Sequence, residues 1–159
     1  MIDEPQFEPW CATRASEIIA GGSGTQDQLL PILHALQAEF GFVHEAAVLL
    51  LASALNLSQA EVHGVVTFYH DFRRSPPQGP VVRLCRAEAC QARGARAVEQ
   101  ALSDALAKSA ETKTPSNVTL DAVYCLGLCA SGPAALVNGR PVARLTGPRL
   151  SQWIEELIA

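Results

Sequence analysis

The amino-acid sequence predicts an α+β protein, in which an N-terminal helical bundle is followed by an α/β domain with a mixed sheet. Apolar residues recur at helical spacing as far as Phe72. A Pro- and Gly-containing segment then interrupts every regular pattern, and strand-like and helical stretches alternate beyond it. We therefore expect a four-helix bundle over residues 1–72, a linker over 73–80 and the α/β domain over 81–159.

The first two helices are delimited by local sequence signals. One is expected over Pro9–Ala20, because a pair of glycines follows it. The second carries its apolar residues from Leu29 to Phe40, with Thr25 as a candidate cap. We expect Pro31 to kink the early part of this second helix, because proline removes a hydrogen-bond donor and clashes with the preceding turn.

The third and fourth helices are expected on either side of a short turn. Glu45–Leu55 is strongly apolar, and Ser58–Glu61 forms a Ser-x-x-Glu capping box that opens the fourth helix. The longest apolar stretch, Ala46–Leu55, is much shorter than the roughly 20 residues that a membrane-spanning helix requires. We therefore expect a buried helix there and no membrane span.

The α/β domain is predicted to have the order strand, helix, strand, strand, strand, helix. The dipeptide Asn138-Gly139 is a strong hairpin signal between the third and fourth strands. The expected elements are strands at Val81–Leu84, Val118–Tyr124, Ala134–Val137 and Val142–Leu145, and helices at Glu88–Lys108 and Leu150–Ile158.

Composition restricts the classes of function. Twelve basic and sixteen acidic residues give a formal charge of −4 with no basic block, so nucleic acid is not an expected partner. The acidic start of the chain does not resemble an export signal, and we expect a cytoplasmic protein. In a reducing compartment, five cysteines point to metal binding or redox chemistry more than to structural disulfides.

Four of these cysteines form two close pairs. Cys85 and Cys90 follow the first predicted strand, and Cys125 and Cys129 follow the second, with 34 residues between the pairs. Loops at the same edge of a sheet can converge on one metal centre. A 2Fe-2S cluster needs four thiolates, two for each iron, and these spacings suit it.

Other uses of the four thiols remain open at this stage. A structural zinc site more often shows tighter cysteine pairs, although spacings of up to four residues occur. In that case the chain would be a zinc-stapled adaptor without redox activity. A Rieske centre would need histidine ligands, and the four histidines all lie in the helical part, far from both pairs in sequence. The sequence also lacks the Cys-x-x-Cys motif of thiol-disulfide oxidoreductases.

The residues around the cysteines suggest how such a centre would be protected. Gly127 and Gly132 permit a close approach of backbone N–H groups to sulfur. Arg86 and Arg93 are cations near the first pair, but each taken singly is expected to be ordinary solvated surface. Cys11, the fifth cysteine, is expected to be a small buried apolar residue.

At these motifs, the sequence resembles the thioredoxin-like 2Fe-2S subunit family that is shared by complex I and by NAD-linked hydrogenases and formate dehydrogenases. The resemblance covers nearly the whole chain, including the helical segment from Gly41 to Tyr69, the first cysteine pair with Arg93-Gly94-Ala95, and the second pair leading to Pro133 and Val137-Asn138. It implies a thioredoxin-like fold for residues 81–159. It also implies one 2Fe-2S cluster bound by Cys85, Cys90, Cys125 and Cys129.

Within that family, the segment Cys85–Gln91 is similar to the gamma subunit of molybdenum-containing, NAD-dependent formate dehydrogenase. This resemblance implies a flavoprotein partner that holds FMN and binds NAD. It also implies a large partner subunit with the molybdenum cofactor and iron-sulfur clusters. The equivalent subunit of complex I (NADH:quinone oxidoreductase) or of an NAD-reducing hydrogenase is the alternative. No nucleotide-binding loop or nucleophile elbow occurs, so we expect no substrate site in this chain.

Overall fold

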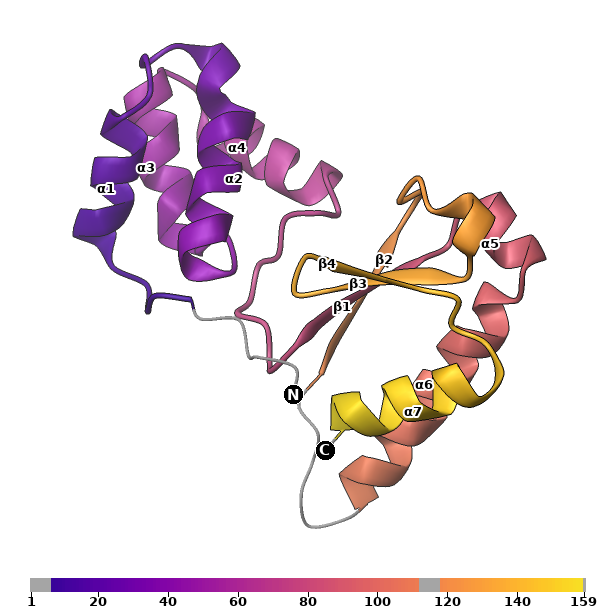
Figure 1. The fold of residues 1–159 in the computed structure, drawn as a ribbon. Coiled ribbons are helices and arrows are strands. Elements are labelled where there is room, and N and C mark those ends of the chain that lie inside the picture. Colours follow the sequence, from indigo (N-terminus) through magenta and orange to yellow (C-terminus); the bar gives the residue numbers. More distant parts are fainter. Residues whose placement is uncertain (1–6, 112–117, 159) are drawn as a thin grey trace. The chain divides into compact units, whose positions relative to one another are not determined.

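The computed structural model describes residues 7–111 and 118–158. The chain divides into two compact units, one formed by Gln6–Pro77 and the other containing Gln78–Ala159 (Figure 1). The first unit is helical and the second combines helices with a sheet. Each unit has a hydrophobic core of its own.

The helical unit buries one apolar stripe from each of its helices. Its described α-helices are α1 (Ala12–Ala20), α2 (Leu29–Phe40), α3 (Glu45–Leu55) and α4 (Gln59–Phe68), with a short 3₁₀ helix, η1 (Gln26–Gln28), before α2. Residues at helical spacing on each helix meet in a common core. The most deeply buried of its larger side chains are Leu33, Leu36, Phe40, Leu51, Leu55 and Val62.

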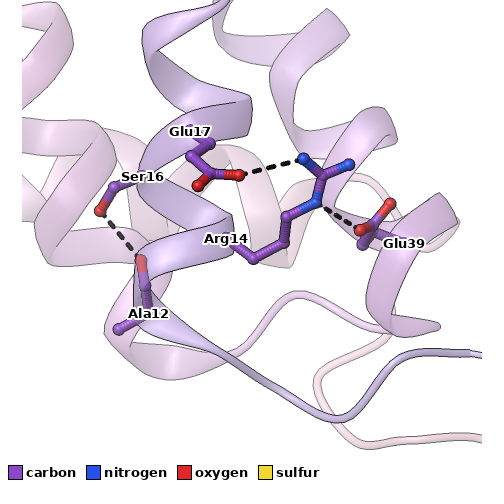
Figure 2. Close-up of polar contacts among 5 residues, drawn as sticks. All are labelled: Ala12, Arg14, Ser16, Glu17 and Glu39. Carbon is purple, nitrogen blue, oxygen red and sulfur yellow. Dashed lines mark hydrogen bonds and ion pairs between the residues drawn. The ribbon is translucent and has the colours of Figure 1, made fainter.

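A charged cluster joins α1 to α2 on the surface of this unit. Arg14 donates from Nε to Glu39 at 2.6 Å and from an Nη nitrogen to Glu17 at 3.1 Å (Figure 2). The hydrogen bond to Glu39 is the main reason why the pKa of Arg14 is raised above its ordinary value. Because all three side chains meet solvent, the cluster orients the two helices more than it stabilises the fold.

Helix α2 differs from expectation at its start. Pro31 lies in the first turn of α2, where a backbone N–H would have no carbonyl partner within the helix. Proline therefore removes no helical hydrogen bond at this position, and the physical reason for the expected kink does not apply. Thr25 precedes η1 instead of α2, and its side chain makes no capping hydrogen bond to the backbone. Gly41 ends the helix with φ of +80°, a left-handed conformation that glycine adopts without steric cost.

One buried glutamine fixes the chain that follows α4. Gln37 of α2 donates from Nε2 to the carbonyl of Asp71 at 2.7 Å and accepts the N–H of Arg73 at 2.6 Å. The carbonyl of Arg73 in turn accepts the N–H of Val43 at 2.7 Å. These bonds satisfy polar groups that would otherwise be costly to bury, and they hold residues 71–73 against the end of α2.

The capping box of α4 is confirmed. The Ser58 hydroxyl accepts the N–H of Glu61 at 3.2 Å, and the Glu61 carboxylate accepts the N–H of Ser58 at 2.8 Å. These bonds, led by the one from the Ser58 backbone, lower the pKa of Glu61.

We expect Ser58→Ala to lower the free energy of unfolding by about 1 kcal/mol, because a helix N-terminus loses its cap. Urea denaturation followed by circular dichroism measures this change. Ser16→Ala is the matched control, since the Ser16 hydroxyl only donates back to the carbonyl of Ala12 within α1 (Figure 2). Equal destabilisation by both substitutions would contradict the assigned cap.

The α/β unit has the mixed sheet that the sequence predicts. Its strands are β1 (Val81–Cys85), β2 (Thr119–Val123), β3 (Ala134–Val137) and β4 (Arg140–Ala143), arranged in the order β2-β1-β3-β4. β1 pairs parallel to β2 and antiparallel to β3, and β3 and β4 form the expected hairpin.

Helices cover this sheet and complete its core. They are α5 (Glu88–Ala92), α6 (Ala95–Glu111) and α7 (Gly147–Ile158), with a 3₁₀ helix, η2 (Cys129–Ser131), before β3. α6 and α7 lie side by side (Figure 1). Leu102 of α6 and Trp153 of α7 pack with strand residues such as Leu84. A helical region is thus followed by an α/β domain with a mixed sheet, which confirms the predicted α+β fold class.

Three predicted boundaries in this unit are wrong. The helix expected over Glu88–Lys108 is two helices, because Gly94 takes φ of +95° and turns the chain between α5 and α6. The last strand is Arg140–Ala143 instead of Val142–Leu145, since the two-residue turn leads directly into pairing at Arg140. α7 begins three residues before the expected Leu150.

Among the described residues, no helix has the length and apolar character needed to span a membrane.

Candidate functional site

The parallel pairing of β1 and β2 brings the two cysteine segments to one edge of the sheet. Cys85 is the last residue of β1 and lies opposite Val123, the last residue of β2. The N–H of Arg86 continues this pairing by donating to the carbonyl of Val123 at 2.8 Å. Both chains therefore leave the sheet together, and Cys125 follows two residues after β2.

The first cysteine pair is buried. Cys85 is 1% exposed and Cys90, on α5, is 2% exposed. Both cysteines belong to one small cluster of buried residues. Ala95 and the half-buried Leu126 pack with these two cysteines, so this part of the site is largely shielded from water.

The second pair lies on a more open and more contorted segment. Cys125 is exposed and has φ of +80°, a left-handed conformation that residues other than glycine rarely adopt. Gly127 has φ of +72°, and Cys129 is half-buried at the start of η2. Such conformations often occur at functional sites, where the surrounding structure enforces them. The unusual backbone at Gly127 is expected from the residue type, whereas that of Cys125 has no signal in the sequence.

Backbone N–H groups from both segments influence the pKa of the Cys85 thiol. Burial by itself would raise the pKa of Cys85, but hydrogen bonds from the N–H of Ala87, the Cys90 thiol, and the N–H groups of Cys125 and Leu126 together lower it. The pKa of Cys90 is raised, first by burial and then by its hydrogen bond to Cys85. These contacts therefore stabilise negative charge on the Cys85 sulfur more than on the Cys90 sulfur.

The two cysteine segments lie against each other at this edge of the sheet. The second segment reaches Cys85 through its N–H groups, and the charge of Cys129 acts on Cys90. In residues 7–111 and 118–158, no three His, Cys, Asp or Glu side chains converge on one point as a single metal ion requires. A 2Fe-2S core is larger than one ion, and N–H donors to sulfur are the environment its ligands use. The donor set fits such a cluster.

Two arginines beside the cysteines are exposed, as the sequence predicts, and each of them also has a partner. Arg86 forms an ion pair with Glu99 and also interacts with the exposed Tyr124. Arg93 donates from Nε to the carbonyl of Gly132 at 2.9 Å. The prediction for Cys11 is wrong, because Cys11 is exposed at the position just before α1.

Gly132 is needed for space and not for its backbone angles, which any residue can adopt. A Cβ atom there would lie 3.2 Å from the Cys90 sulfur and 3.5 Å from Cδ of Arg93. We expect Gly132→Ala to displace Cys90 and to reduce the bound iron of the purified chain by at least about tenfold. Iron analysis tests this.

Gly64→Ala is the matched control, because a Cβ on Gly64 of α4 would meet nothing within 4 Å. This control should keep its iron and gain slightly in stability from higher helix propensity. Unchanged iron in Gly132→Ala would show that the close approach is not required.

Comparisons with known proteins identify relatives of this chain. An NADH-quinone oxidoreductase subunit from Buchnera aphidicola is 31% identical over 77% of this chain and 76% of its own length. The protein of the same name from Escherichia coli strain K12 is 30% identical over 77% of this chain and 75% of its own length. The crystal structure of an NAD+-reducing [NiFe]-hydrogenase in the H2-reduced state matches with a TM-score of 0.66 and 26% identity.

The hydrogenase match covers 85% of this chain but only 23% of the hydrogenase chain, so this chain spans less than a quarter of that protein. A family model described as thioredoxin-like [2Fe-2S] ferredoxin matches residues 15–158, which include most of both units and all four paired cysteines. The chain therefore belongs to the thioredoxin-like 2Fe-2S ferredoxin family.

Proposed function

We propose that this chain is an electron-transfer subunit that binds one 2Fe-2S cluster through Cys85, Cys90, Cys125 and Cys129. The observation that carries the proposal is the parallel pairing of β1 and β2, which brings both cysteine segments to one edge of the sheet, where Leu126 packs with Cys85 and Cys90. Family membership supports the type of cluster. The ligand set is our proposal from the grouping of the four thiols.

The protein contributes an environment in which an electron can be held without side reactions. Once bound, the cluster would supply one-electron redox chemistry. Burial of Cys85 and Cys90 excludes water from one side of the site. Backbone N–H groups at Cys85 stabilise negative charge on sulfur, which increases when an electron arrives.

As the parent complex, we propose a cytoplasmic, NAD-dependent formate dehydrogenase. The similarity of Cys85–Gln91 to its gamma subunit supports this choice. In such a complex the chain would exchange single electrons with a flavoprotein that holds FMN and binds NAD. A flavin accepts two electrons as hydride and releases them singly, so one-electron carriers belong beside it. A large subunit would hold the molybdenum cofactor and further iron-sulfur clusters.

A second candidate is the equivalent position in an NADH-quinone oxidoreductase. The names of the Buchnera and Escherichia relatives favour it. The hydrogenase match favours an NAD-reducing hydrogenase in the same way. All three candidates place the chain in a multi-subunit complex that reacts with NAD or NADH.

Anaerobic purification of the chain, followed by iron, acid-labile sulfide and zinc analysis and by EPR after dithionite reduction, tests the cofactor. Equal iron and sulfide with a signal that appears on reduction supports the proposal. Zinc without sulfide would overturn it in favour of a structural adaptor.

Isolation of the chain with its natural complex tests the parent enzyme. Reduction of NAD by formate in that complex supports the formate dehydrogenase. Oxidation of NADH by quinone, or reduction of NAD by hydrogen, would instead select one of the alternatives.

A further inference from the structure

Arg93 differs from the other arginine beside the cysteines in what it binds. Arg86 has its charge neutralised by Glu99. Within the described part of the chain, Arg93 makes no ion pair with a carboxylate, and its Nε donates to the backbone carbonyl of Gly132 at 2.9 Å. A positive charge without a carboxylate partner thus lies beside the paired cysteines.

The bonds of Arg93 connect one cysteine segment to the other. Its own N–H donates to the carbonyl of Cys90 at 3.1 Å, and its side chain reaches Gly132, which lies 39 residues further along the chain. The N–H of Gly132 in turn donates to the carbonyl of Cys129 at 3.3 Å. Arg93 therefore links the backbone of a cysteine in the first pair to the backbone of a cysteine in the second.

Packing reinforces this connection. The Cys90 sulfur and Cδ of Arg93 both lie within 3.5 Å of the point where a Gly132 side chain would begin. The Arg93 stem and the sulfur thus press against the same stretch of backbone. The turn at Gly94, with φ of +95°, separates Arg93 from α6 and ends the short helix that carries Cys90.

We infer that Arg93 is a positioning residue of the cysteine site: it clamps the Cys129–Gly132 segment to the Cys90 segment and raises the reduction potential of the bound cluster. The inference rests on the proposed 2Fe-2S function. The clamp fixes the spacing between one cysteine of each pair. The guanidinium charge favours the reduced cluster, because reduction adds a negative charge near it.

Hydrogen exchange in the unloaded chain tests the clamp without any cluster. In Arg93→Gln, we expect the amides of residues 129–132 to exchange about fivefold faster, because one hydrogen bond that restrains this segment is lost. Amides of β1 should exchange as in the wild type. Exchange at 129–132 that equals the wild type would overturn the clamp.

Potentiometric titration of the loaded chain, followed by EPR, tests the charge. In Arg93→Gln, the ratio of reduced to oxidised cluster at a fixed potential should fall about threefold, which is about 28 mV for a one-electron couple at 59 mV per tenfold. Arg93→Lys keeps the charge and loses the fork of donors, so its potential should stay closer to that of the wild type while its exchange at 129–132 rises. A lowered potential in both variants would overturn the charge effect.

Arg96→Gln is the matched control. Arg96 lies three positions further on α6 and donates from Nε to Gln91 at 3.1 Å, so it makes no bond to the second cysteine segment. In this variant, the exchange rates at 129–132 and the reduction potential of the cluster should both stay at wild-type values. A wild-type chain that takes up no cluster would defeat the proposed function, and the exchange measurement would still decide whether Arg93 is a clamp.

Discussion

Cys125→Ser should lose its cluster while keeping its fold. Cys125 is exposed, so replacing its sulfur with oxygen leaves no cavity in the core. A serine hydroxyl stays protonated at neutral pH and is a poor substitute for a thiolate ligand. Replacing a residue that only supports a metal ligand already lowers metal affinity about 10–100-fold, so replacing a ligand itself should lower it further. Iron and acid-labile sulfide in the anaerobically purified variant measure the effect.

Cys11→Ser is the control for this substitution. Cys11 is also exposed, but it lies before α1 in the helical unit and is not one of the four grouped cysteines. Its visible and EPR spectra should match those of the wild type. Full iron and sulfide in Cys125→Ser, or their loss in Cys11→Ser, would refute the ligand assignment.

Phe40→Ala should lower the free energy of unfolding by about 3–5 kcal/mol, because it removes a large buried ring. Phe40 is 1% exposed in the core of the helical unit. Its ring packs edge-on against that of Trp10, with 5.0 Å between the ring centroids. A deletion at this position leaves a cavity between helices that cannot fully collapse. Urea denaturation followed by far-ultraviolet circular dichroism measures the change.

Phe68→Ala makes the same chemical change on the surface. Phe68 ends α4 and is 73% exposed, so its loss should change stability by no more than about 0.5 kcal/mol. An effect of Phe40→Ala as small as that of Phe68→Ala would contradict the assignment of Phe40 to the core.

Features that depend on neighbours in sequence can be predicted from the sequence. The Ser58–Glu61 capping box and the Asn138-Gly139 hairpin are both confirmed, because a few adjacent residues determine them. The gathering of the cysteines follows from a simple rule, since two strands that lie parallel deliver their following loops to one edge.

Other features require the coordinates. The Ala-rich pattern of residues 88–108 continues through Gly94, and helical periodicity does not reveal that this glycine takes a positive φ. The exposure of Cys11 depends on packing that the sequence does not display. Arg93 is recognisable in the sequence as a cation near the first cysteine pair, but its partner Gly132, 39 residues away, has no local signal.

The parallel pairing of β1 and β2 has a consequence for biosynthesis. Cys125 leaves the ribosome 40 positions after Cys85, a delay of roughly 2–8 s at the usual rates of translation. Until β2 reaches β1, the first thiols have emerged without the N–H donors of the second segment. Cluster delivery to a nascent chain would therefore be premature, and maturation factors should recognise the folded domain in preference to its emerging cysteines.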